Sequence, residues 1–192
     1  MSLNQLLKEV QAAEEELLMG NVILYPTDTV WGIGCDAEEA KAVQKVFKIK
    51  ERDPSKSMII LVADADMVRH YVEEVPENFE KMLEEQDQPT TYIFEGARNL
   101  PEEVIAPDGS IAIRVVKDEF CHRLIRQLDR PLVSTSANLS GGKSPATFAE
   151  IDEEVKKRVD YVVRWRQDED TAAKPSRIVK IKANGETETI RE

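Results

Sequence analysis

The chain alternates short runs of Val, Ile and Leu with longer amphipathic segments, and this alternation limits the folds that it can form. Short runs rich in β-branched residues predict buried strands, whereas apolar residues spaced three and four apart predict helices with one buried face. Strands and helices that alternate along a chain predict an α/β domain. The last two runs flank Asn184-Gly185, which predicts a hairpin and therefore a mixed sheet. The strands are expected at residues 22–25, 58–63, 90–94, 110–116, 131–134, 161–163, 177–182 and 186–190, and the helices at about 3–18, 36–48, 64–72, 76–86, 120–128 and 147–158.

Length and composition favour one globular domain over residues 1–192. The formal net charge is −11, so the surface as a whole repels nucleic acid. No apolar run approaches the roughly 20 residues that a membrane span needs, and the acidic, amphipathic start does not resemble a signal peptide. We therefore expect a cytoplasmic protein with no membrane partner. Cys35 and Cys121 lack metal-ligand spacing and are expected to be small buried thiols.

A basic run over residues 41–56 contains the first candidate site. Lys50 and Arg52 stand two apart at a predicted helix end, and Pro54 disfavours helix at the residue before it. Side chains two apart diverge on a helix but converge on an extended backbone, so the two cations are expected to point the same way. Arginine offers a planar fork to phosphate or carboxylate, and lysine offers a mobile point charge. The run predicts an anion site, with a solvated helix C-terminus as the alternative.

A polar stretch at residues 134–142 contains the second candidate site, directly after an expected strand. It contains four hydroxyl side chains, an amide and two successive glycines that let the backbone approach a ligand. Ser136 and Asn138 would face the same way if the segment stayed extended. No histidine or neighbouring lysine is positioned by sequence to activate Ser136, so we expect it to bind rather than attack. The alternative is an ordinary turn rich in Ser, Asn and Gly.

Arg114 lies at the centre of the expected strand at 110–116, where a charge is rarely buried without a partner. It is therefore expected either in the site or in a structural ion pair. The sequence contains neither a Walker-type phosphate loop nor a G-x-G-x-x-G pattern. If a nucleotide binds, cations and hydroxyls must hold its phosphates instead.

Three segments, taken in order, resemble the YrdC-like family of threonylcarbamoyl-AMP synthases. They are Tyr-Pro-Thr-Asp-Thr-Val-Trp-Gly-Ile-Gly at 25–34, Ile-Lys-Glu-Arg-Asp-Pro-Ser-Lys at 49–56 and Val-Ser-Thr-Ser-Ala-Asn-Leu-Ser-Gly at 133–141. The resemblance implies a single-domain α/β fold with a twisted, open mixed sheet flanked by helices and a concave groove. It also implies the synthesis of threonylcarbamoyl-AMP from L-threonine, bicarbonate and ATP, for the threonylcarbamoyladenosine modification of tRNA.

The same resemblance assigns residues and partners. The core site would comprise Lys50, Arg52, Ser136 and Asn138, while Thr29 would help to hold threonine and Lys56, Arg114 and Ser176 would contact nucleotide or substrate. ATP would be a substrate of this nucleotidyltransferase, with Mg²⁺ carried on it, and no metal is expected to be held by the protein itself. Possible macromolecular partners are tRNA or double-stranded RNA and a transferase protein that receives the product.

Three alternatives stay open at this point. The chain could be an RNA- or nucleotide-binding module without synthase activity, in which the run at 41–56 binds phosphates and Trp165 stacks a base. Packing of Trp165 against the core is the competing interpretation of that residue. The chain could use a different amino acid in a related carbamoyl or adenylyl transfer. Departures from the family pattern at residues 87–91 and at Ser176-Arg177 leave membership of its divergent YciO-like branch open.

Overall fold

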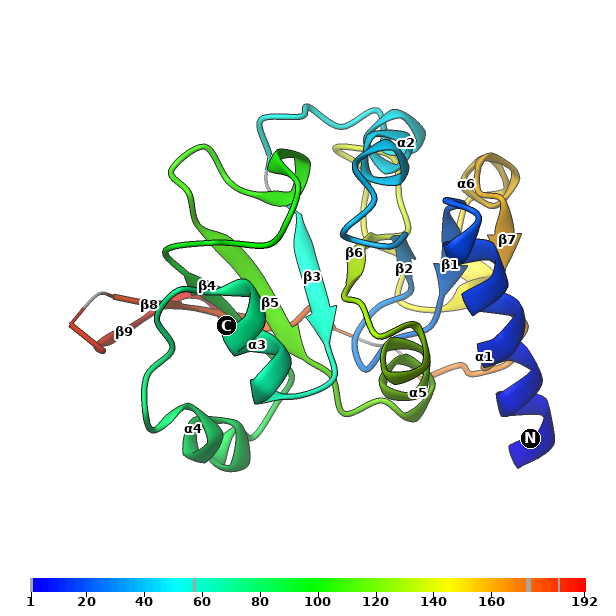
Figure 1. The fold of residues 1–192 in the computed structure, drawn as a ribbon. Coiled ribbons are helices and arrows are strands. Elements are labelled where there is room, and N and C mark those ends of the chain that lie inside the picture. Colours follow the sequence, from blue (N-terminus) through cyan, green and yellow to red (C-terminus); the bar gives the residue numbers. More distant parts are fainter. Residues whose placement is uncertain (1, 57, 172–173, 183) are drawn as a thin grey trace.

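The computed structural model describes residues 2–56, 58–171, 174–182 and 184–192 (Figure 1). The helices are α1 (Leu3–Leu18), α2 (Ala40–Lys50), α3 (Ala65–Tyr71), α4 (Phe79–Glu85), α5 (Glu119–Leu128) and α6 (Glu153–Arg158), with 3₁₀ turns η1 (Glu102–Val104) and η2 (Phe148–Glu150). The strands are β1 (Ile23–Tyr25), β2 (Gly32–Gly34), β3 (Ile59–Val62), β4 (Thr90–Phe94), β5 (Ile111–Val115), β6 (Leu132–Ser136), β7 (Tyr161–Val162), β8 (Arg177–Ile181) and β9 (Thr187–Arg191).

These strands form a mixed sheet in the order β7-β1-β2-β6-β3-β5-β4-β8-β9. The pairs β1–β7, β3–β5 and β4–β8 are parallel, and the remaining neighbours are antiparallel. Strand β6 joins the two halves because it pairs with β2 on one side and β3 on the other. Figure 1 shows the strand direction turning steadily from β1 to β8. The predicted twisted, open α/β sheet is confirmed.

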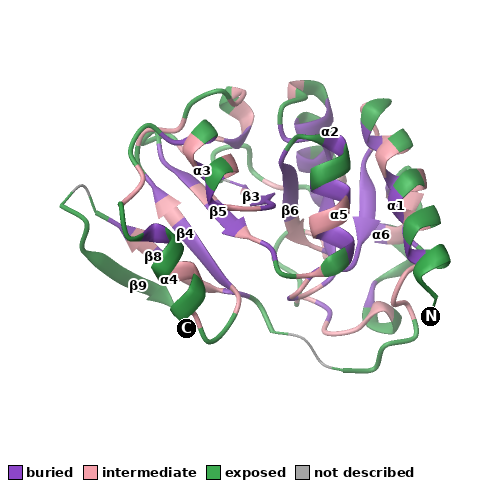
Figure 2. Cartoon of the chain, turned by 60° about the horizontal axis from the view of Figure 1, so that its bottom comes forward, coloured by how far each residue is buried: buried purple, intermediate pink, exposed green. Residues whose placement is uncertain are grey.

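Successive residues of the central strands point to opposite faces of the sheet, so each face has its own core. Ile23, Tyr25 and Leu61 pack in a cluster with α1 and α5, whereas Leu24 and Ile60 pack in a second cluster with α2 and α6. Both cysteines are buried, as predicted. Figure 2 shows the buried strands between helices whose outer surfaces are exposed. Such a doubly covered sheet gives the strand ends at its centre a rigid support.

Several expected elements differ in detail. Strand β2 was not expected, because its Gly-Ile-Gly sequence has no β-branched run beyond Ile33. A residue with a Cβ would not fit at Gly34, where that atom would lie 1.8 Å from the carbonyl oxygen of Val133. The helix expected from about residue 36 begins later, at Ala40, and Asp36 instead pairs with Arg130 at 2.7 Å. The expected helix at 147–158 is divided into η2 and α6, with Asp152 capping the latter.

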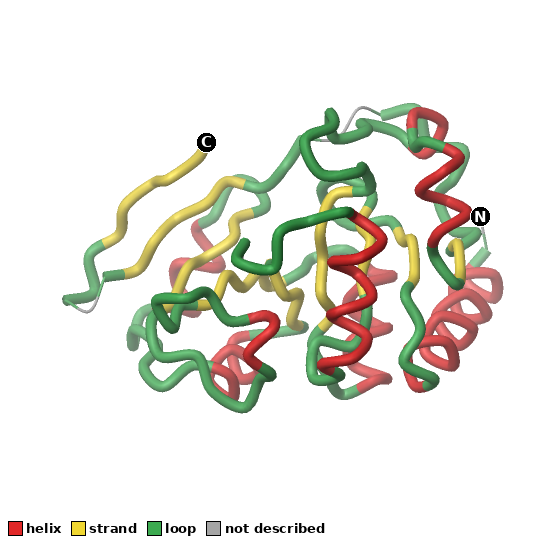
Figure 3. The backbone as a smooth tube through the Cα atoms, turned by 90° about the horizontal axis from the view of Figure 1, so that it is seen from above, coloured by secondary structure: helices red, strands yellow, loops and turns green. Residues whose placement is uncertain are grey.

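The predicted C-terminal hairpin is confirmed as β8–β9. Figure 3 shows the hairpin extending from the edge of the molecule, and β9 is exposed along its whole length. None of the helices in the described ranges is both long enough and apolar enough to span a membrane.

Candidate functional site

A cavity of about 200 Å³ opens where β2, β3 and β6 meet the start of β8. Cationic and hydroxyl side chains dominate its wall. The lining residues are Thr29, Val30, Gly32, Arg52, Met58, Ile59, Arg114, Ser134, Thr135, Ser136, Ser144, Pro175, Ser176 and Arg191. This set contains three guanidinium groups and no carboxylate, so the cavity suits an anion.

The end of helix α2 directs Arg52 into this cavity. Glu51 follows the helix in the left-handed conformation, with φ of 52° and ψ of 40°. The amide of Arg52 then donates to the carbonyl of Phe47. This hydrogen bond closes residues 47–52 into a turn that ends the helix. Arg158 stabilises this turn by donating to the Ile49 carbonyl at 3.2 Å and to the Glu51 carboxylate at 2.7 Å. The backbone therefore turns sharply between Lys50 and Arg52, and the extended segment that we expected there is wrong.

Lys50, the last residue of α2, is buried and is not among the residues that line the cavity. Its side chain is 1% exposed, and the ammonium donates to the carbonyl of Ser136 and, at 2.6 Å, to the carbonyl of Asn138. The Lys50 carbonyl in turn accepts from the amide of Ser140 at 2.8 Å. Burial, assisted by the neighbouring Arg52 guanidinium, lowers the pKa of Lys50 to about 8. Lys50 thus joins the end of α2 to the loop after β6.

The polar segment at residues 134–142 lines the cavity only as far as Ser136, the last residue of β6. Ser134, Thr135 and Ser136 line the cavity, but the strand ends there and the amide of Asn138 donates back to the Ser136 carbonyl at 2.8 Å. The Asn138 side-chain amide donates to the carbonyls of Leu139 and Gly142. Asn138 therefore shapes the loop and is not a lining residue, contrary to the common orientation expected for an extended segment. Its Oδ1 atom is buried with no hydrogen-bond partner among the described residues.

The opposite wall is built from β5 and the loop after β1. Arg114 is 4% exposed, and its Nη2 atom lies 3.1 Å from Asp28 Oδ1 and 3.4 Å from Thr27 Oγ1. The Thr27 hydroxyl accepts from the amide of Thr29 and donates to the Val30 carbonyl, so the loop is tightly closed. The Thr29 hydroxyl lies 3.0 Å from that of Thr27. Arg114 is thus both ion-paired and part of the cavity wall, so the two interpretations of its sequence position hold together.

The last wall comes from the C-terminal part of the chain. The hydroxyl of Ser176 lies 2.7 Å from that of Thr91, and the Ser176 carbonyl accepts from Nε and Nη2 of Arg191. Partial burial and, to a lesser degree, the charge of Arg114 lower the pKa of Arg191, and both guanidinium groups line the same cavity. An anion between them would relieve the repulsion between these two charges.

Of the residues singled out from the sequence, the structure brings Thr29, Arg52, Arg114, Ser136 and Ser176 together around the cavity. Lys50 and Asn138 support the site from behind, and Lys56 is an exposed residue of the turn that follows α2 and is not among the lining residues. Ser134 and Thr135, which the sequence indicated only as part of the stretch at 134–142, also line the cavity, and sequence reasoning missed Ser144 and Arg191. No local pattern distinguishes Arg191 from a solvent-facing residue of an edge strand.

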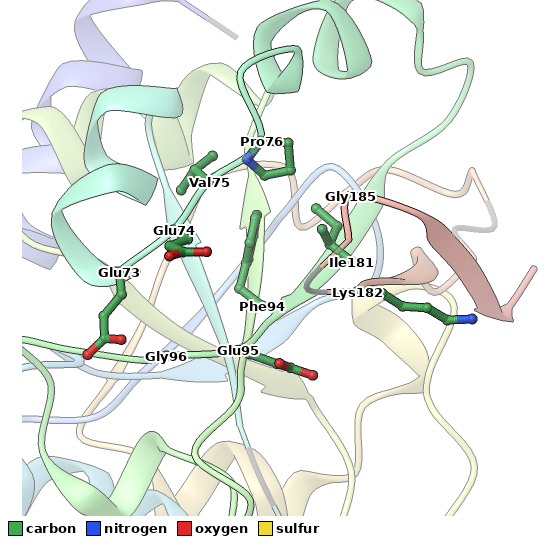
Figure 4. Close-up of a pocket in the computed structure, with 10 residues that line it drawn as sticks. All are labelled: Glu73, Glu74, Val75, Pro76, Phe94, Glu95, Gly96, Ile181, Lys182 and Gly185. Atoms are coloured by element: carbon green, nitrogen blue, oxygen red, sulfur yellow. The ribbon is translucent and has the colours of Figure 1, made fainter.

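A second cavity, of about 400 Å³, lies beside β4 and the turn after β8 (Figure 4). Its charged lining residues are Glu73, Glu74, Glu95 and Lys182. The excess of carboxylates repels phosphate, so this cavity does not compete with the first as an anion site. In the described part of the chain, no group of three His, Cys, Asp or Glu side chains is arranged to hold a metal ion.

The sequence profile of the family described as telomere recombination, Sua5/YciO/YrdC, matches residues 15–192. The chain belongs to this family. It is 35% identical over 174 residues to a threonylcarbamoyl-AMP synthase of Idiomarina loihiensis, which covers 88% of this chain and 91% of the relative.

Two solved structures share the fold. Escherichia coli YciO superposes with a TM-score of 0.81 at 23% identity, covering 97% of this chain and 89% of YciO. Sua5 of P. abyssi in complex with L-threonine superposes with a TM-score of 0.83 at 23% identity, covering 97% of this chain. The chain spans only 54% of that Sua5 protein. At these identities the two superpositions establish the fold alone. The chain resembles YciO and Sua5 to nearly the same degree, so the superpositions do not distinguish between them.

Proposed function

We propose that this protein is a threonylcarbamoyl-AMP synthase that works on L-threonine, bicarbonate and ATP in the arginine-lined cavity. The observation that supports this most directly is the convergence of Arg52, Arg114 and Arg191 with the hydroxyls at the end of β6. Such a wall suits both a triphosphate and the carboxylate of an amino acid, since guanidinium groups bind phosphate and carboxylate oxygens in a planar fork. Membership of a family with curated synthases then identifies the reaction.

The reaction joins two anions, and the cavity offers the charges that this needs. The threonine amine attacks the carbon of bicarbonate to form a carbamate with loss of water, and a carbamate oxygen then attacks the α-phosphorus of ATP while pyrophosphate leaves. Arg52 and Arg191 would neutralise the phosphates, and the hydroxyls of Ser134 and Ser136 would orient their oxygens. Holding both substrates in line can lower the barrier by about 7 to 11 kcal/mol. Thr29, on the opposite wall, would contact threonine.

The size of the cavity limits what it can enclose. Sites for whole drug-sized ligands have volumes of roughly 300 to 1,000 Å³, whereas this cavity measures about 200 Å³. We infer that it encloses the reacting phosphates and the amino acid, with the adenosine lying toward the opening. Mg²⁺ would arrive as part of the ATP substrate, because the wall offers guanidinium and hydroxyl groups rather than the carboxylates that this ion prefers.

A nucleic-acid-binding module without chemistry is not favoured. Trp165 packs against the core cluster of α1 and α5. Arg166 is engaged with Asp118 and Glu169, so the pair does not form a stacking platform. Delivery of the product to tRNA by a separate transferase protein stays a prediction, as does the cytoplasmic location in which that modification would take place.

The test is pyrophosphate release from Mg–ATP, with L-threonine and bicarbonate omitted in turn. Release that requires both, together with threonylcarbamoyl-AMP in the mass spectrum, supports the proposal. Release with another amino acid but not with threonine would overturn the substrate assignment. ATP binding without release under any of these conditions would overturn the synthase reaction and favour a non-synthase branch of the family.

A further inference from the structure

Arg166 adopts a backbone conformation that its side chain disfavours. Its φ is +62°, in the left-handed region where residues other than glycine are uncommon. Such conformations persist where surrounding contacts hold them, and they gather at functional sites. The Arg166 side chain is 27% exposed and lies in the segment that follows β7. The contacts of its guanidinium group hold this conformation in place.

The guanidinium joins three separate parts of the chain. Its Nη1 atom donates to the carbonyl of Thr27 at 3.1 Å and to the carboxylate of Asp118 at 2.7 Å. Its Nε atom donates to Glu169 at 2.7 Å. Asp118 is 10% exposed and also caps helix α5 by accepting from the amide of Cys121. Arg166 therefore fastens the loop after β1 to the N-terminal end of α5.

Thr27 transmits this attachment to the cavity wall. While its carbonyl is held by Arg166, its hydroxyl accepts from the Thr29 amide at 3.0 Å and lies 3.0 Å from the Thr29 hydroxyl. The same hydroxyl lies 3.4 Å from Nη2 of Arg114. Thr29 and Arg114, the two residues that contact the Thr27 hydroxyl, line the cavity, whereas Arg166 is not among the lining residues. Loss of Arg166 would release the Thr27 carbonyl and loosen that wall while leaving the wall formed by Arg52 and β6 in place.

We propose that Arg166 is a positioning residue that sets the Thr29 hydroxyl and Arg114 for amino-acid binding. This inference rests on the proposed function, in which Thr29 contacts L-threonine. It assigns a task to the segment after β7, for which the sequence suggested either base stacking by Trp165 or packing of Trp165 against the core. Because the arginine acts through Thr27, its removal should weaken the threonine side of the cavity and spare the phosphate side.

The test compares Arg166→Gly and Arg166→Lys with the unmodified protein. Glycine accepts the left-handed conformation, so this variant removes the guanidinium without adding backbone strain. Lysine keeps the charge but not the fork, and can reach only part of the acceptor set. Pyrophosphate release is measured against L-threonine at saturating ATP and against ATP at saturating L-threonine. Arg164→Ala is the matched control, because Arg164 is an exposed arginine two residues earlier.

We expect Arg166→Gly to raise the KM for L-threonine at least tenfold and to change the KM for ATP less than twofold. Arg166→Lys should fall between this variant and the unmodified protein, and Arg164→Ala should match the latter. Unchanged threonine KM in Arg166→Gly, or equal rises in both KM values, would overturn the inference.

A second measurement does not depend on turnover. Hydrogen–deuterium exchange of the Thr29 amide should be at least tenfold faster in Arg166→Gly, because its acceptor Thr27 is no longer fixed. Equal exchange in the two proteins would overturn the positioning role. If the unmodified protein releases no pyrophosphate with L-threonine, the proposed function fails, while this comparison still decides whether Arg166 orders the loop.

Discussion

Replacing Lys50 with methionine tests whether this lysine acts as a structural link rather than as a surface cation. The ammonium is buried and donates to the carbonyls of Ser136, the last residue of β6, and Asn138, in the loop that follows it. Methionine has nearly the same length and flexibility, so it fills the space but donates no hydrogen bond. The variant leaves both carbonyls without their present donor and separates the end of α2 from the loop.

The expected loss of stability can be worked from these two bonds. An unsatisfied buried acceptor costs about 1 to 3 kcal/mol, so two such acceptors cost about 2 to 6 kcal/mol. Both bonds are only partly buried, so water can replace part of this loss. Removing the ammonium also removes the penalty for burying its charge, which is several kcal/mol for an ion taken out of water. Combining these opposed effects, we expect a net decrease of about 2 kcal/mol in the unfolding free energy.

Urea denaturation of the unmodified protein and of Lys50→Met measures this difference, and pyrophosphate release measures its consequence for the site. We expect Lys50→Met to lose stability and activity together, because Ser136, whose carbonyl Lys50 holds, lines the cavity. Lys41→Met is the control, since Lys41 is an exposed residue of the same helix. A variant that loses activity while its unfolding free energy stays unchanged would refute the structural role and identify Lys50 as a direct substrate ligand.

Three further results follow from the structure. Arg52→Ala should lower the rate of pyrophosphate release about a hundred- to a thousandfold in a variant that remains folded, and a loss below tenfold would exclude it from the phosphate site. The folded-state pKa of Lys50, about 8, lies below its ordinary value of 10.5. Between pH 8 and pH 10.5 the folded chain therefore binds fewer protons than the unfolded chain, and its stability rises with pH. The stability difference between the unmodified protein and Lys50→Met should therefore grow from pH 8 to pH 10, and a flat difference in urea titrations would contradict the lowered pKa. Gly34→Ala should lower the unfolding free energy by about 1 to 3 kcal/mol in urea titration, because the new Cβ would meet the Val133 carbonyl, and a neutral result would contradict this packing.

The architecture could be predicted well from the sequence because most of its helices and strands have a regular pattern of apolar residues. Apolar runs located the strands, including the hairpin around Asn184-Gly185, to within a few residues. Strand β2 was not predicted because its two glycines are required by close packing and not by strand propensity. Tyr25 and β6 fill the space that side chains at these positions would occupy. That requirement comes from contacts between distant segments, which no local window contains.

The candidate site was predicted in part. Arg52 and Ser136 were expected at the site and line the cavity, because each lies at or just past the end of a regular element. The sequence could not show that Lys50 and Arg52 take different positions, one buried and one lining the cavity. Their separation depends on a left-handed turn at Glu51, which Arg158 stabilises from another part of the chain. Arg191 was missed for a similar reason: only the register of β8 and β9 brings it to Ser176.

The most direct test of the account is the dependence of pyrophosphate release on L-threonine and bicarbonate, measured with Mg–ATP and the full chain. The account predicts release only when both are present, with one threonylcarbamoyl-AMP formed for each pyrophosphate. Pyrophosphate formed at the same rate without L-threonine, or no pyrophosphate from a folded protein that binds ATP, would contradict it.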